Sequence, residues 1–171
     1  MSEFQIIFFN GMLHMVTSEC VIVAVDVEGK VWRTIDMPQT KDAPFDTEPG
    51  FIGLSHGRLY FTKTDDIVCE KLAIWVLEDY SSGEWTLKHT ISYMHLVRMK
   101  YVQFDFGEFW VVSIHPQHNL IFCVFGHDKT LISYDMDSGN VRTIHDLGRS
   151  CRPNVIPYVP LFSESLANGK Q

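Results

Sequence analysis

The stretch Leu77–Trp85, which reads LEDYSSGEW, contains a pattern that occurs three times in the chain. An apolar run ends on an aspartate, a turn with one glycine follows, and a second run begins six residues after the aspartate. The other copies start at Asp26 and Asp135 and carry Gly29 and Gly139 in the turn. An aspartate can accept hydrogen bonds from turn N–H groups, and glycine supplies the positive φ of a tight hairpin. The pattern therefore predicts a β-hairpin repeated three times.

The spacing of the three aspartates indicates a larger repeat. They are separated by 53 and 56 residues, and a period near 50 residues is typical of the four-stranded blades of kelch-type β-propellers. Further β-prone runs supply two more strands beside each hairpin, and no segment shows a convincing helical period. We therefore predict an all-β fold with three four-stranded antiparallel blades of a kelch-like β-propeller. Closed propellers have four to eight blades, so three blades leave the ring incomplete.

The blades are expected at about residues 4–37, 51–91 and 109–146, within a domain of residues 1–146. Residues 147–171 are expected to form a C-terminal tail. The dipeptide Asn10-Gly11, between two apolar runs, is the strongest two-residue hairpin signal in the chain. Residues 38–50 and 92–108 connect the blades, and Tyr101–Phe106 in the second connector is a candidate edge strand.

Apolar patterning predicts which strands lie inside the stack. Continuous apolar runs at Ile6–Phe9, Cys20–Val25 and Leu120–Phe125 indicate strands that neighbouring blades cover on both faces. The fourth strand of each blade is more mixed, which suits an outer edge. Trp32 and Trp85 occupy the same repeat position, so we expect both to fill gaps between blades. An incomplete ring leaves apolar blade faces open at both ends, and such faces favour self-association.

Composition excludes several classes of partner. A formal charge of −7, from 14 basic and 21 acidic residues, lacks the positive field that nucleic acid requires. No apolar run approaches the roughly 18 residues of a membrane span, and no signal-peptide pattern precedes Phe4. We therefore expect neither a nucleic-acid nor a membrane partner, and a cytoplasmic or nuclear location. The four cysteines stand far apart in or beside apolar runs, which predicts buried free thiols.

No motif predicts catalysis, a metal or a cofactor. The sequence Gly53–Gly57, GLSHG, matches the nucleophile elbow of α/β-hydrolases, but that elbow requires a following helix and the next residues are β-type. A proline-containing turn separates His115 from His118, so the two imidazoles do not lie on one helix face as in a zinc pair. A propeller-type enzyme needs convergent polar groups at the channel mouth, and the chain offers only scattered histidines. The enzyme remains the less favoured alternative to a binding domain.

A partner site is expected on the face that carries the blade connectors. In a propeller these connectors share one face with the loops between second and third strands, here residues 38–50, 64–71, 92–108 and 126–129. Loops on a rigid scaffold commonly carry recognition. The candidate contact residues are Phe45, Asp66, His95, Arg98 and His127. The alternative is that these stretches are only solvated connectors.

Three motifs in order resemble the F-box associated domain of plants. They are Asn10–His14 (NGMLH), Leu72–Leu87 (LAIWVLEDYSSGEWTL) and Tyr158–Leu166 (YVPLFSESL). The resemblance covers essentially the whole chain. It implies a kelch-like propeller that follows an F-box and captures a target protein for a cullin-based ubiquitin ligase.

The resemblance lacks one part of the family pattern. No Leu-Pro-rich helical segment precedes Phe4, so we do not expect binding to the ligase adaptor. The predicted function is a non-enzymatic protein-interaction domain similar to the substrate-recognition region of F-box proteins. A truncated paralogue without retained ligase function is the alternative, and the sequence does not identify the target protein.

Overall fold

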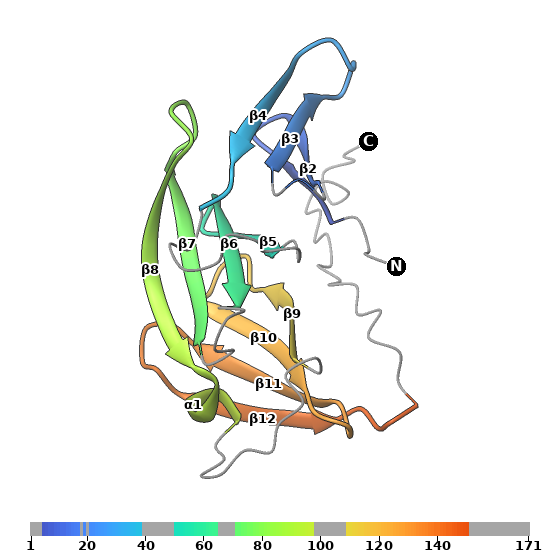
Figure 1. The fold of residues 1–171 in the computed structure, drawn as a ribbon, viewed down its shortest axis with the longest axis vertical. Helices are drawn as coiled ribbons and strands as arrows, with labels where there is room; N and C mark the ends of the chain where they lie inside the picture. The colour runs from blue at the N-terminus through green and yellow to red at the C-terminus, as the bar shows by residue number, and fades with distance from the viewer. Residues whose placement is uncertain are drawn as a thin grey trace, which may run out of the picture.

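Three four-stranded antiparallel sheets make up the described part of the chain, as Figure 1 shows for the computed structural model. The structure describes residues 5–17, 19, 21–38, 50–64, 71–97 and 109–150. Sheet A contains β1 (Ile6–Phe9), β2 (Met12–Val16), β3 (Val21–Asp26) and β4 (Trp32–Asp36). Sheet B contains β5 (Phe51–Ser55), β6 (Arg58–Thr64), β7 (Lys71–Asp79) and β8 (Glu84–Ser92). Sheet C contains β9 (Phe109–Ile114), β10 (Leu120–Phe125), β11 (Thr130–Asp135) and β12 (Val141–Asp146).

Within each sheet the strands pair in chain order, so the predicted all-β fold with three four-stranded sheets is confirmed. The fourth strands β4, β8 and β12 are edge strands, as their mixed composition predicted. The first strands lie close together, because β5 contacts both β1 and β9. The sheets therefore fan out as an arc, with sheet B between sheets A and C (Figure 1).

Two apolar cores hold the arc together. The core between sheets A and B includes Ile22 and Ile35 from one sheet and Phe61 and Trp75 from the other. The second core lies between sheets B and C and includes the buried side chains Leu72, Ile74, Leu96, Ile121 and Ile132. Burial of apolar side chains at both faces of sheet B is what stabilises the stack.

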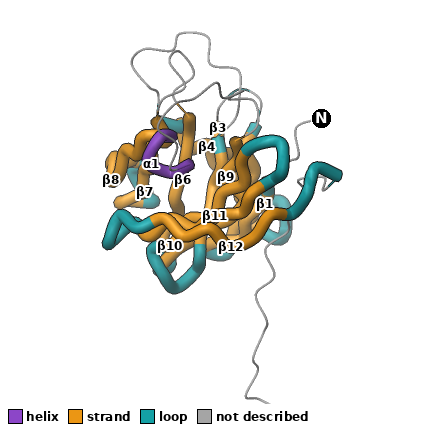
Figure 2. Tube along the Cα trace, turned by 90° about the horizontal axis from the view of Figure 1, so that it is seen from below, coloured by secondary structure: helices purple, strands orange, loops and turns teal. Residues whose placement is uncertain are grey.

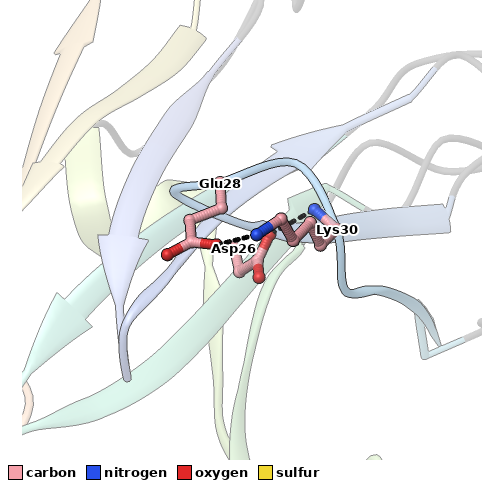
Figure 3. A network of polar contacts seen from close by, with 3 residues as sticks. All are labelled: Asp26, Glu28 and Lys30. Atoms are coloured by element: carbon pink, nitrogen blue, oxygen red, sulfur yellow. Dashed lines mark hydrogen bonds and ion pairs between the residues drawn. The ribbon is translucent and has the colours of Figure 1, made fainter.

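The turns follow the predicted chemistry. Asn10 and Gly11 have φ values of 51° and 76°, as a tight hairpin of the primed type requires. Asp26 Oδ1 accepts the N–H of Lys30 at 2.7 Å, in the turn that Figure 3 shows. The corresponding oxygen of Asp79 accepts the N–H of Ser81 at 2.8 Å.

The third turn aspartate behaves in the same way. Asp135 Oδ1 accepts the N–H groups of Asp137 and Ser138 at 2.9 and 3.3 Å. Hydrogen bonds from Ser138 and from the Asp137 backbone hold the pKa of the Asp135 carboxyl below its ordinary value. The predicted role of the three aspartates is therefore confirmed.

Burial of the strands differs from the prediction because sheets A and C are the ends of the stack. In β1, Ile6 and Phe8 are 57% and 56% exposed, so the prediction that both faces of this strand are covered was wrong. The strand buried on both faces is β7, where the six residues from Leu72 to Leu77 are all buried. β7 belongs to the middle sheet and has a neighbouring sheet on each side.

The two repeat tryptophans also differ from each other. Trp85 is half-buried and packs against the core between sheets A and B, as expected for a residue between blades. Trp32 is 69% exposed, so the prediction that it fills a gap between blades was wrong. It lies in the first sheet of the stack, on the face that points away from sheet B.

One short helix, α1 (Tyr93–Val97), follows β8 and was not predicted from the sequence. It lies beside β8 of sheet B (Figure 2). Its buried residues Tyr93, Leu96 and Val97 belong to the core between sheets B and C. The candidate edge strand at Tyr101–Phe106 lies outside the described residues. Among the described residues, no helix has the length and apolar character needed to cross a membrane.

Candidate interaction surface

The junction between sheets A and B is built around a buried histidine. His14 of β2 is fully buried, and its Nε2 lies 2.8 Å from the hydroxyl oxygen of Tyr80 in the β7–β8 turn. The ring of Phe9 lies edge-on to the Tyr80 ring, with their centroids 5.7 Å apart. The turn of sheet B therefore inserts a side chain into sheet A.

Burial lowers the pKa of His14, and the positive charge of Arg33 acts in the same direction. The carbonyl groups of Ile7 and Met12 oppose this effect without overcoming it. The neutral imidazole donates its Nδ1–H to the Met12 carbonyl at 3.2 Å. Its Nε2 is then free to accept the hydroxyl proton of Tyr80, so a single tautomer satisfies both contacts.

Two further residues secure the same junction. Arg33 of β4 lies over the Tyr80 ring at 4.7 Å, and its Nη2 donates to the Ser81 carbonyl at 3.4 Å. Trp85 Nε1 donates to the Asp36 carbonyl at 2.9 Å. The turn of one sheet thus contacts the outer strand of the sheet before it.

The junction between sheets B and C uses equivalent parts. Met136, in the β11–β12 turn, is buried in the second core, and Tyr60 of β6 packs against that core. At the first strands of the two sheets, an added Cβ on Gly53 would lie 2.8 Å from Ile114 Cδ1. β5 therefore approaches β9 too closely for a larger residue at position 53. The N–H of His56 donates to the Pro116 carbonyl at 2.8 Å, which joins the first turns of the two sheets.

Sheet A leaves one apolar face outside both cores. Residues directly opposite each other in neighbouring strands share a face, and the strand registers define this one. We call it the outer face of sheet A, and its apolar members are Ile6, Phe8, Leu13, Met15, Val21, Val23, Val25 and Trp32. None of these residues belongs to either core. Contiguous apolar faces of this kind are typical of interaction sites.

Sheet C has a mixed face outside both cores at the other end of the stack. The registers place on it the residues Trp110, Phe122, Val124, Leu131, Ser133, Arg142 and His145, which we call the outer face of sheet C. Its centre is covered at Val124, which is 1% exposed, and most of its other members are half-buried. Lys129 Nζ lies 4.3 Å from the centroid of the Trp110 ring. Arg142 and His145 are exposed on the edge strand β12. The two ends of the stack therefore differ in charge.

The structure separates the two described members of the predicted partner site. His95 is exposed on α1, and its Nε2 lies 2.8 Å from the Gly139 carbonyl in the β11–β12 turn. His127 is exposed in the β10–β11 turn, at the opposite end of β11. Phe45, Asp66 and Arg98 lie outside the described residues. A partner-binding role for these five residues stays a prediction.

The motif that resembles a nucleophile elbow and the pair of histidines at positions 115 and 118 both have structural roles. Ser55 ends β5 and donates its hydroxyl to the His118 carbonyl at 3.3 Å, and the strand β6 follows where a nucleophile elbow would have a helix. His115 Nδ1 accepts the N–H groups of Gln117 and His118, both at 3.1 Å. Burial, and then the proximity of His118, lower the pKa of His115.

The described part of the chain contains no group of three His, Cys, Asp or Glu side chains that could hold a metal ion. Cys123 is buried in the second core, as predicted, and burial raises the pKa of its thiol. Cys20, Cys69 and Cys151 lie outside the described residues.

The sequence predicts open blade faces but does not identify the residues on them. The necessary signal is the position of a strand in the stack, because a continuous apolar run is buried on both faces in β7 of sheet B but has one exposed face in β1 of sheet A. Trp32 and Val27, both strongly exposed, belong to the first of the three repeats and have no described sheet before them.

Comparison with known proteins gives one informative similarity. No family model matches the chain. An F-box protein of Arabidopsis thaliana is 33% identical over an alignment of 102 residues that covers 54% of this chain and 25% of that protein. About half of the chain is therefore related in sequence to a region of an F-box protein. The match spans only a quarter of the relative's length.

Proposed function

We propose that the chain is a non-enzymatic protein-interaction domain, of the kind that serves as the substrate-recognition region of F-box proteins in cullin-based ubiquitin ligases. The observation that carries this proposal is the 33% identity to an F-box protein over about half of the chain. The arc of three all-β sheets with a large open apolar face supports it, because binding needs a shaped surface and no reacting groups. The resemblance of the chain to the F-box associated domain points to the same role.

The experiment measures both the capture of target proteins by the chain and their ubiquitylation. The chain is expressed as a fusion behind a complete F-box, and proteins bound to it are identified by mass spectrometry with and without proteasome inhibition. We expect a small set of captured proteins whose ubiquitylation and turnover depend on the fused chain. A fusion of the same F-box to an unrelated β-propeller of similar size is the control.

Two outcomes would contradict the proposal. One is a fusion that captures no protein beyond those bound by the control fusion. The other is turnover of a substrate by the purified chain alone, which would make it an enzyme. Alanine at His95 and His127, the two described candidate contacts, then tests whether the predicted connector face carries recognition.

A further inference from the structure

The residue that follows each turn aspartate contacts the preceding sheet wherever a preceding sheet is described. In sheet B this residue is Tyr80, which reaches His14 of sheet A. In sheet C it is Met136, which is 5% exposed in the core shared with sheet B. In sheet A it is Val27, which is 73% exposed. The same position is thus half-buried at one junction, buried at the other and open at the first sheet.

The residue six positions after each aspartate follows the same rule. Trp85 packs against the core between sheets A and B, and Val141 is buried in the core between sheets B and C. Their counterpart in sheet A is Trp32, which is 69% exposed. The outer face of sheet A therefore corresponds to the face that sheet B packs on sheet A and to the face that sheet C packs on sheet B.

The face of sheet A that contacts the turn of sheet B also has a counterpart in sheet C. The registers place His14 opposite Ala24 in sheet A and Phe122 opposite Ser133 in sheet C, so these two side chains occupy equivalent positions. His14 receives Tyr80 from sheet B. Phe122 is half-buried and belongs to neither core.

The outer strand supplies a second matching position. Arg33 pairs with Ala24, and Arg142 pairs with Ser133. Arg33 donates to the carbonyl of Ser81, two residues after the aspartate of the next sheet. Arg142 is exposed at the open end of sheet C. The outer face of sheet C therefore repeats the surface that sheet A offers to sheet B.

We propose that two copies of this chain associate head to tail, with the outer face of sheet A of each copy packed on the outer face of sheet C of the other. Two-fold symmetry gives two identical junctions and closes a ring of the six described sheets, three from each copy, which is within the four to eight found in propellers. In each junction Val27 packs on Phe122, as Tyr80 packs on His14. This association does not depend on the proposed role in ubiquitin ligases.

Charge favours this pairing over a contact between two copies of the outer face of sheet C. The residue equivalent to Ser81 in sheet A is Glu28, so the head-to-tail junction brings Glu28 next to Arg142 of the other copy. Glu28 is exposed and lies 2.6 Å from Lys30 Nζ in the same turn (Figure 3). The outer face of sheet C carries Arg142, and Lys129 lies over its Trp110 ring. Two copies of the sheet C face would repel each other.

The test measures the mass of the full chain by sedimentation velocity over a concentration series. We expect a reversible dimer of two 19.7 kDa chains and no larger species. Glu28→Arg and Arg142→Glu should each raise the dimer dissociation constant about tenfold, because both junctions of the ring carry the change. The double variant Glu28→Arg/Arg142→Glu should restore the dimer, since it exchanges the two charges across every junction.

The control is Met94→Arg, which adds charge at a 52% exposed methionine on α1, outside both faces. It should leave the dimer unchanged, and circular dichroism should show that all variants keep the β-sheet spectrum and, at a concentration where every variant is monomeric, the same melting temperature. A chain that stays monomeric at every concentration would overturn the proposal. So would growth beyond a dimer, loss of the dimer in only one of the two single variants, or a double variant as weak as the singles.

Discussion

The buried imidazole of His14 makes the stability of the molecule depend on pH. Its folded-state pKa lies below the ordinary value of 6.5, chiefly because burial disfavours the charged ring. Below about pH 6.5 the unfolded chain therefore binds a proton that the folded chain does not bind, and stability falls as the pH falls. The loss continues until the folded-state pKa is reached.

We expect a smaller free energy of unfolding at pH 5.5 than at pH 7.5, measured by urea denaturation. His14→Gln should be less stable at pH 7.5 but should lose part of this pH dependence, because the buried titrating group is gone. His145→Gln, at an exposed position of β12, is the matched control and should keep it. An unchanged pH dependence in His14→Gln would show that another group is responsible.

Gly53 tests how closely the inner strands of sheets B and C approach. An added Cβ would lie 2.8 to 3.0 Å from three carbon atoms of the Ile114 side chain. Gly53→Ala should therefore cost about 1–3 kcal/mol through overpacking. Ile114→Val removes the nearest of these atoms, so the double variant should cost less than the sum of the single changes. Additive costs in urea melts would mean that the two residues do not meet.

At the scale of the strand pair, the two repeat tryptophans separate the effect of sequence from the effect of position. Trp85→Ala should cost about 3 kcal/mol, because the ring packs on the core and donates a hydrogen bond to Asp36. Trp32→Ala should cost less than about 0.5 kcal/mol in the monomer, because its ring is mostly exposed. Urea melts at low protein concentration measure both. Equal losses would contradict the observed difference in burial.

Local sequence was sufficient to predict the hairpins and the sheets. Aspartate, glycine and apolar alternation act within a few residues, and the turns at Asp26, Asp79 and Asp135 form as expected. Burial was harder to predict because it depends on what lies across the face. Trp32 and Trp85 occupy the same position in the repeat, yet only Trp85 has a described sheet to pack against.

The candidate site was less predictable than the fold for the same reason. The connector residues are predicted contacts because loops on a rigid scaffold commonly bind partners, which is a property of the architecture and not of these side chains. His95, one of them, uses its ring to hold α1 against the β11–β12 turn. The open sheet faces became visible only when the order of the three sheets was known.

At the scale of the whole molecule, the stack should be most stable in the middle. Sheet B packs on a core at each face, whereas sheets A and C each pack on one. In a stack of repeated units, stability is the sum of each unit and its interfaces with its neighbours. End sheets with a single interface should therefore open locally more often than sheet B.

Hydrogen exchange followed by mass spectrometry tests this order and the proposed ring together. At low concentration we expect the slowest exchange in β6 and β7 and faster exchange in sheets A and C, because only sheet B has two described neighbours. At a concentration where the ring forms, sheets A and C each gain a second interface, and their exchange should slow toward that of sheet B. The Glu28→Arg variant should keep the fast exchange of the end sheets at both concentrations. Uniform protection of all three sheets at low concentration would contradict the stack argument, and an unchanged gradient at high concentration would contradict the ring.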